Sequence, residues 1–249
     1  MHLSIIIFMS TLVNLGNTST PSEPEVAIEL TAHSEIEHFF TAADAFFQLN
    51  VKNGLVDYKS IHSSPDKIEK LAEMIANIDL SKSSNGAKTA FYINAYNLLT
   101  IKNVVDNWPM ASPLDNAGFF NKVTFMVAGD KMTLNDIENN HLRPDPRVHF
   151  VLVCGANGCP KIINNAYTPG NLQLMLDKQT KKAMNDPQFI RVSSNEKKVE
   201  ISEIFKWYSD DFVKHSGSVT AYINAYRDTP LPSKAEVGYY TYDWKVNAK

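Results

Sequence analysis

The chain has 249 residues and a net charge of −3, with 44% hydrophobic and 20% charged residues. This composition excludes an intrinsically disordered protein, and the interspersed charges form no basic stripe of the kind that binds nucleic acid. A single large domain is expected, because no Pro/Ser-rich linker interrupts the chain after Thr31.

The N-terminus predicts an exported protein. Residues 3–15 are mostly apolar, a run shorter than the roughly 20 residues that cross a membrane, and small and polar residues follow it. This pattern indicates a secretory signal peptide, although no Lys or Arg precedes the run; the alternative is a buried N-terminal helix. We predict a signal peptide at 1–20, a linker at 21–33 and one globular domain at 34–249, in a periplasmic or secreted protein. No later segment is apolar enough for stable membrane insertion of the mature chain.

Helical spacing of apolar residues and capping signals predict much of the regular structure. In chain order, helices are expected at 34–50, at 65–77, at 86–107, from Thr133 onwards and at 169–185. Ser34 is the expected N-cap of the first helix. Thr133 and Asp136, three residues apart, form another capping pair.

Strands are predicted between and after these helices. They comprise a strand–turn–strand unit in FFNKVTFMVAGDKM, a buried strand at 147–153, a hairpin around Ser194–Asn195 and an extended C-terminal segment, VGYYTYDWKV. Helices combined with a mainly non-sequential set of strands indicate an α+β fold. We expect a mixed or antiparallel sheet packed by several helices.

Two amides on the 86–107 helix are candidates for a binding role. In FYINAYN, Asn94 and Asn97 are three residues apart and share one helical face, while Phe91 and Leu98 point to the core. Asn is a mediocre helix former, so this pair indicates a hydrogen-bonding task. The amides either brace neighbouring backbone or orient a catalytic group or a substrate.

The stretch VHFVLVCGANGCP at 148–160 contains the only two cysteines of the chain. Cys154 and Cys159 flank a loop of Gly, Ala, Asn and Gly, and three interpretations stay open: a nucleophilic Cys154, a structural disulfide, or a redox-active or metal-linked pair. A thiolate entering a Gly-rich loop can be stabilised by free backbone N–H groups. An oxidising compartment favours the disulfide.

Several motifs together resemble a known family. They are FYINAYNLLTIKNVV, TLNDIENNHLRP, DPRVHFVLVCGANGCP, AYTPGNL, SEIFKWYSDDF and the terminal YDW, and they extend from about Val51 to Asn247. In this order they closely resemble the domain of unknown function 547 family, which occurs in bacteria, plants and animals. The family has no settled activity, and many bacterial members look exported. By analogy, the resemblance implies a papain-like or transglutaminase-like site.

The family pattern can be carried over residue by residue. It falls on Asn94, Tyr96, Asn97, Asp136, Ile137, Glu138, Arg143, His149, Cys154, Gly155 and Pro160. One position departs, because Asn139 stands where the family usually has a histidine. Plant relatives tend to carry Ser in place of Cys159 while they keep the counterpart of Cys154, which implies a separate task for Cys154.

A nucleophilic cysteine needs a base and a group that orients the base. His149 is the nearest candidate, although five positions along a regular strand would separate it from Cys154 by about 16 Å and turn the two side chains to opposite faces. Glu138 could orient the base or accept a proton, with His141 on its helical face. The alternatives are a core His149 bonded to backbone and a Glu138 paired with Arg143.

Two functions of different classes remain. No GxGxxG, P-loop or HExxH motif occurs, and no cofactor or metal site is predicted. The first function is an exported cysteine-dependent hydrolase or acyl transferase that acts on an amide or thioester. Its catalytic residues would be Cys154, His149 and Glu138, and its substrate-binding residues Asn94, Asn97 and Arg143. The second is a non-catalytic binding module for a small-molecule or peptide ligand, closed by a Cys154–Cys159 disulfide.

Overall fold

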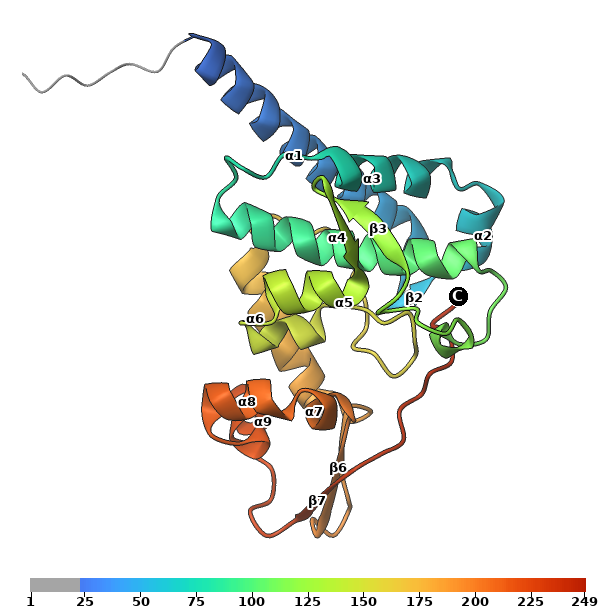
Figure 1. Ribbon diagram of the computed structural model, residues 1–249. Helices are drawn as coiled ribbons and strands as arrows, with labels where there is room; N and C mark the ends of the chain where they lie inside the picture. Colours follow the sequence, from blue (N-terminus) through green and yellow to red (C-terminus); the bar gives the residue numbers. More distant parts are fainter. Residues whose placement is uncertain (1–22) are drawn as a thin grey trace, which may run out of the picture.

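A computed structural model describes residues 23–249, with their side chains from Glu35 onwards (Figure 1). The predicted signal peptide lies outside the described residues. The fold is α+β, as predicted: helices form most of the structure, and three small sheets accompany them.

The helices occupy most of the positions that the sequence predicts. They are α1 (Glu23–Asn50), α2 (Tyr58–Ser63), α3 (Asp66–Asn77), α4 (Asn85–Asp106), α5 (Leu134–Ile137), α6 (Leu172–Asn185), α7 (Ile204–Trp207), α8 (Ser209–Ser216) and α9 (Val219–Tyr226). Three further turns are η1 (Pro113–Asp115) and η3 (Pro146–Phe150), both 3₁₀-helices, and η2 (Glu138–Leu142), a π-helix.

The strands are short. They are β1 (Val51–Lys52), β2 (Leu55–Val56), β3 (Thr124–Val127), β4 (Asp130–Thr133), β5 (Ile190–Val192), β6 (Lys198–Ile201) and β7 (Glu236–Tyr239). Strands β3 and β4 form the predicted strand–turn–strand unit, and β5 and β6 form the predicted antiparallel hairpin. Strand β7 pairs in parallel with β6, with Lys198 opposite Glu236, so the largest sheet is mixed.

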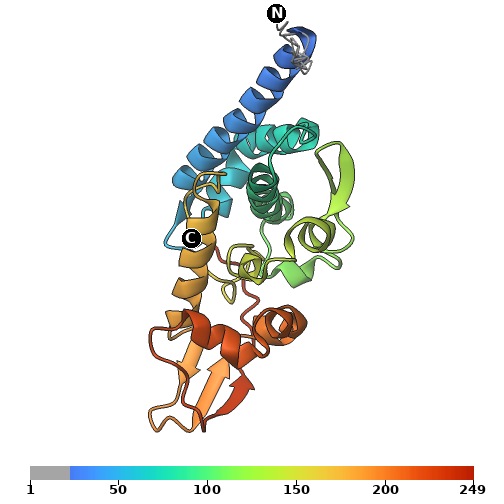
Figure 2. The same cartoon turned by 90° about the vertical axis from the view of Figure 1, so that its left-hand side faces the viewer.

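Two groups of elements lie at opposite ends of the molecule (Figures 1 and 2). Helices α1 to α4 gather at one end, and α7 to α9 with the β5–β6–β7 sheet form the other. Helix α4 is buried on nearly every side, which suits a helix at the centre of a core. The C-terminal segment after β7 runs back from the sheet end to the α1–α4 end.

That returning segment pairs with the cysteine loop. The Asn157 N–H donates to the Lys245 carbonyl at 2.8 Å, and the Gly158 N–H donates to the Asp243 carbonyl at 2.8 Å. A Cβ on residue 158 would lie 2.9 Å from the ring of Tyr242, so glycine is needed at this position for the ring to approach the loop. Gly158 therefore serves close packing of the loop against the C-terminal segment.

One predicted helix start and one predicted strand are wrong. Helix α1 begins at Glu23, so the predicted linker at 21–33 is helical from Glu23 onwards and Ser34 is not an N-cap. The predicted strand at 147–153 is instead η3 followed by irregular chain. Asp145 caps η3 by accepting from the Arg147 N–H at 3.0 Å, and a proline at the first position favours a helical turn. The continuous apolar run reflects burial, which is common to strands and buried helical turns.

Within the part of the chain that the structure describes, no helix has both the length and the apolar character needed to cross a membrane.

Candidate functional site

The three residues predicted as catalytic line one cavity of about 330 Å³, between α4, η2, η3, α7 and the C-terminal segment. Its wall is largely aromatic. The lining residues are Tyr96, Phe120, Asn135, Glu138, His149, Leu152, Cys154, Cys159, Ile204, Trp207, Tyr208, Tyr242 and Trp244. Glu138, His149 and Cys154 are therefore brought together, although the predicted strand geometry would have separated the last two.

His149 is held between two carboxyl groups. Its Nε2 lies 2.9 Å from Asp211 Oδ2, and its Nδ1 lies 3.5 Å from Glu138 Oε1. The imidazole is buried and stacks on the ring of Tyr208, with centroids 3.8 Å apart. These contacts fix the orientation of the imidazole, with a carboxyl group at each of its two nitrogens. The alternative of a core histidine bonded to backbone is not what the structure shows.

Asp211 is the functional candidate that the sequence analysis missed. It lies in the first turn of α8, where a carboxylate is favoured, and it also accepts from Arg143 Nε at 2.7 Å. Burial disfavours the Asp211 carboxylate, but the hydrogen bonds from Arg143 and His149 outweigh burial and hold the pKa of Asp211 below its ordinary value. The SEIFKWYSDDF motif contains Asp211, and this motif was the signal available in the sequence.

Glu138 begins the π-helix η2, whose wider turn is closed by the Arg143 N–H donating to the Glu138 carbonyl at 2.8 Å. Such turns occur often at functional sites. Glu138 is only 6% exposed, and the structure pairs Arg143 with Asp211 instead of with Glu138. The pKa of Tyr208 is raised mainly by burial and further by the neighbouring carboxyl group of Glu138. The Tyr208 hydroxyl therefore stays protonated beside Glu138.

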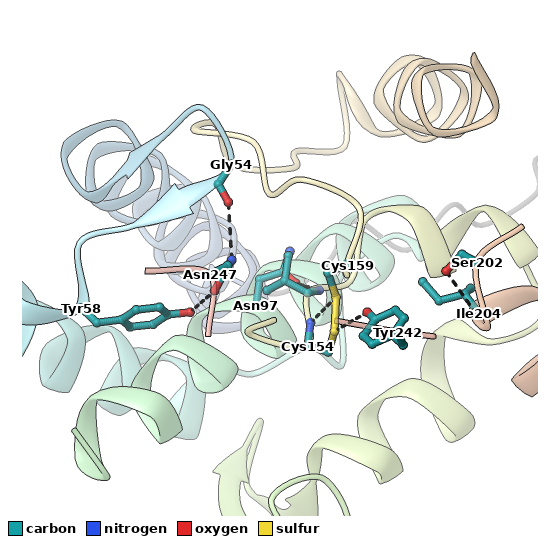
Figure 3. The surroundings of a disulfide bond; sticks show 10 residues. Gly54, Tyr58, Asn97, Cys154, Cys159, Ser202, Ile204, Tyr242 and Asn247 are labelled. Atoms are coloured by element: carbon teal, nitrogen blue, oxygen red, sulfur yellow. Dashed lines mark hydrogen bonds between the residues drawn. A yellow bond between two sulfur atoms is a disulfide. The ribbon is translucent and has the colours of Figure 1, made fainter. Parts of the chain in front are cut away.

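Cys154 and Cys159 form a disulfide, with their Cα atoms 6.2 Å apart (Figure 3). Burial raises the pKa of Tyr242 well above its ordinary value, so the protonated Tyr242 hydroxyl donates to Cys154 Sγ at 2.9 Å. The Cys154 N–H donates to Cys159 Sγ at 2.8 Å. No described histidine is hydrogen-bonded to either sulfur atom. In this state Cys154 has no thiolate.

The amides of Asn94 and Asn97 brace backbone instead of reaching the cavity. Asn94 Nδ2 donates to the Tyr167 carbonyl at 2.7 Å, and its Oδ1 accepts from the Tyr167 N–H at 3.0 Å. Asn97 donates to the Val151 carbonyl at 3.0 Å and accepts from the Val153 N–H at 2.9 Å. Both side chains are buried, so the structure shows the bracing contacts, and a role in substrate binding stays a prediction.

The remaining sequence candidates lie behind the cavity wall. Arg143 pairs with Asp211 and also donates to Asn139 Oδ1 at 2.9 Å. Its guanidinium group therefore holds the Asp211 carboxylate in place instead of facing a substrate. Asn139, at the position where the family usually has a histidine, therefore accepts a hydrogen bond from Arg143. His141 stacks on the ring of Tyr92 with centroids 3.9 Å apart and does not line the cavity.

A second cavity of about 590 Å³ also borders the cysteine loop. Cys159 lines both cavities, so the disulfide loop forms part of both walls. The second cavity is lined by charges of both signs, among them Lys182, Arg191 and Asp186. The buried acid–imidazole arrangement lies only in the smaller cavity, which is why we take the smaller one as the candidate site.

Residues 80–182 match the family model described as "Protein of unknown function, DUF547". This match supports the family resemblance. The DUF547 segment contains Glu138, His149 and both cysteines, whereas Trp207, Asp211 and the C-terminal aromatic residues lie beyond it. No curated protein and no solved structure matches the chain.

Proposed function

We propose that the protein is a binding module for a small organic molecule or a peptide side chain, and that the 330 Å³ cavity is its site. The observation that carries the proposal is the combination of aromatic walls with a buried Glu138 and a fixed His149, which is typical of ligand sites with a few well-placed polar groups. The disulfide supports this proposal over a cysteine nucleophile in the oxidised protein, because it joins two segments of the wall and leaves no thiol.

A fragment screen by ligand-observed NMR tests the proposal. Trp207 lines the cavity and is 43% exposed, so Trp207→Ala removes contact surface without opening the core. Fragments that bind the wild type should lose most of their binding to Trp207→Ala and keep it with Leu174→Ala, a matched exposed apolar residue on α6. Fragments that bind all three proteins equally, or no fragment at all, would contradict the proposal.

A cysteine-dependent hydrolase or acyl transferase is the second candidate, and it requires the reduced protein. The supporting observation is that Cys154 lines the same cavity as Glu138 and His149, with the Tyr242 hydroxyl at its sulfur. A dithiol reductant would become a disulfide and leave two cysteine thiols. The Cys154 thiolate would then attack the acyl carbon and form a thioester with the enzyme, while the bond to the leaving amine or thiol breaks and the leaving group takes up a proton. Water, or an acceptor in the case of a transferase, would then attack this thioester, lose a proton and release the Cys154 thiolate.

Labelling with iodoacetamide tests this second candidate. The oxidised protein should not react; after reduction, Cys154 should react faster than a free cysteine near neutral pH, and Cys159→Ser should keep that reactivity. Thioester hydrolysis should appear only after reduction and should be lost in Cys154→Ser. Equal hydrolysis by reduced wild type and Cys154→Ser would exclude this activity.

Export is part of the proposal. The apolar run at 3–15 supports a signal peptide, and a disulfide between two neighbouring cysteines suits an oxidising compartment. Deletion of residues 1–20 should keep the protein in the cytoplasm, as measured by fractionation. Continued appearance of the deleted form outside the cytoplasm would contradict the signal peptide.

A further inference from the structure

The charge of the cavity wall is unbalanced. Glu138 is the one acidic residue that lines the cavity, and no Lys or Arg is among the described lining residues. The nearest guanidinium group, that of Arg143, is paired with Asp211 at 2.7 Å. The only ion-pair contact of Glu138 among the described residues is with His149, whose Nδ1 lies 3.5 Å from Glu138 Oε1, a separation longer than an ordinary hydrogen bond. A buried carboxylate without a close cationic partner is costly, and a positively charged ligand would offset that cost.

The aromatic wall fits the same kind of ligand. The rings of Trp207, Tyr242 and Trp244 pack against one another with centroids 4.8 Å to 5.6 Å apart, and all three line the cavity. The faces of aromatic rings attract cations, tryptophan most strongly. The ring of Tyr208 already makes such a cation–π contact, because the Arg143 guanidinium carbon lies 5.7 Å from the centroid of that ring.

Other ligand classes fit less well. An anion would meet Glu138 in a wall to which no described Lys or Arg contributes. A sugar needs several free hydrogen-bonding groups, but the Tyr242 hydroxyl is engaged with Cys154 and His149 is engaged with Asp211. An alkylated ammonium group needs only ring faces and one carboxylate, which are what the wall supplies.

We propose that the cavity binds an organic ammonium cation, with Glu138 as its counter-charge and Trp207, Tyr242 and Trp244 as its aromatic contacts. This inference rests on the proposed function of the cavity as a ligand site. The cationic group belongs either to a small molecule with a methylated ammonium or to a lysine side chain of a peptide. The shared chemistry is a positive charge carried by an alkyl body.

Calorimetric titration of the full oxidised protein at pH 8, where an ordinary imidazole is neutral, tests the proposal. Three probes are used: choline, its neutral carbon isostere 3,3-dimethyl-1-butanol, and butylammonium as a mimic of the lysine side chain. Choline or butylammonium should bind about tenfold more tightly than the neutral isostere. Tighter binding of choline indicates a methylated ammonium ligand, and tighter binding of butylammonium indicates a lysine side chain.

Variants separate charge from apolar contact. Glu138→Gln should reduce the preference for the cation over the neutral isostere to about twofold or less, while Glu236→Gln, an exposed acid on β7, should leave the preference unchanged. Trp207→Leu replaces an exposed aromatic ring by an apolar side chain and should also lower the preference for the cation over the neutral isostere. This variant tests the proposal even if Glu138→Gln does not fold.

Two outcomes overturn the proposal. Equal binding of choline, butylammonium and the neutral isostere would show that the cavity does not select for charge, and the proposed binding function would stand without this ligand class. If neither cation binds but fragments that depend on Trp207 are still found, the ammonium ligand is rejected and the proposed binding function stands. If fragments also fail to bind, the proposed function itself fails.

Discussion

At the scale of single residues, the site is defined by how each charged group is partnered. His149 contacts two carboxyl groups, Asp211 contacts His149 and Arg143, and Arg143 contacts Asn139. Asn139, where the family that the chain resembles usually has a histidine, therefore lies behind the wall, and the imidazole of His149 still lines the cavity. Asn139 does not remove the only candidate base.

Asp211→Asn should reveal the pH dependence of this network. Because the pKa of Asp211 is lowered in the folded protein, its stabilising contribution is present above the unfolded value of about 3.9 and is lost as the pH falls through the folded value. The variant should lose about 2 kcal/mol of unfolding free energy at pH 7, since hydrogen bonds to charged groups contribute amounts of this order. The difference from wild type should shrink below pH 4.

Urea denaturation at pH 7 and at pH 3.5 measures this difference. The matched control is Asp210→Asn, because Asp210 is the exposed neighbour of Asp211. Its effect should stay within about 0.5 kcal/mol at both pH values. A constant difference between wild type and Asp211→Asn across this range would contradict the assigned pairing.

At the scale of elements, helix α4 organises the chain that carries the site. Its buried asparagines bind backbone groups of segments without regular hydrogen bonding: Asn94 binds Tyr167, Asn97 binds Val151 and Val153, and Asn103 binds the Phe119 carbonyl at 3.1 Å. The Asn97 contacts come directly before Cys154, so this amide sets the path of the chain into the disulfide loop (Figure 3).

Asn97→Leu should destabilise the protein by about 2–6 kcal/mol. The leucine has a similar volume but leaves two buried backbone groups unpaired, each at a cost of about 1–3 kcal/mol. Asn77→Leu, at an exposed asparagine near the end of α3, should change stability by less than about 0.5 kcal/mol. Thermal and chemical unfolding measure both. An Asn97→Leu protein as stable as wild type would refute the bracing role.

At the scale of the whole molecule, the C-terminal segment joins the two hydrophobic clusters. One cluster is centred on α4, and the other on α7 to α9 and the β5–β6–β7 sheet. Tyr242 belongs to the second cluster, whereas Asn247 accepts from the buried Tyr58 hydroxyl at 2.7 Å beside the first. The same segment carries Tyr242 and Trp244 into the cavity, so the stability of the molecule and the shape of the site depend on one stretch of chain.

Tyr58→Phe should show this dependence. The substitution removes one hydroxyl and leaves Asn247 Oδ1 without that donor in a buried position, at a cost of about 1–3 kcal/mol. Tyr239→Phe, at a tyrosine that is 44% exposed, should cost less than about 0.5 kcal/mol. Guanidinium denaturation measures both variants. Equal stability of the two would mean that the Tyr58–Asn247 contact does not hold the C-terminal segment.

Local signals in the sequence were sufficient for part of the fold and of the site. The helices near 65–77 and 86–107, the Thr133–Asp136 capping box and the hairpin β5–β6 follow from periodicity and capping, which act over a few residues. The family resemblance, together with residue chemistry, singled out Glu138, His149 and Cys154, which line one cavity in the structure.

Only the tertiary structure decided how these residues are partnered. The contact of His149 with Asp211 spans 62 positions, and that of Asn94 with Tyr167 spans 73. A buried apolar run such as 147–153 has no local feature that separates a strand from a helical turn, so the path of the chain there depends on what covers it. Trp207, Tyr242 and Trp244 meet only because the C-terminal segment folds back over the disulfide loop. Pairing over such distances depends on the packing of the entire core, and no short stretch of sequence contains that information.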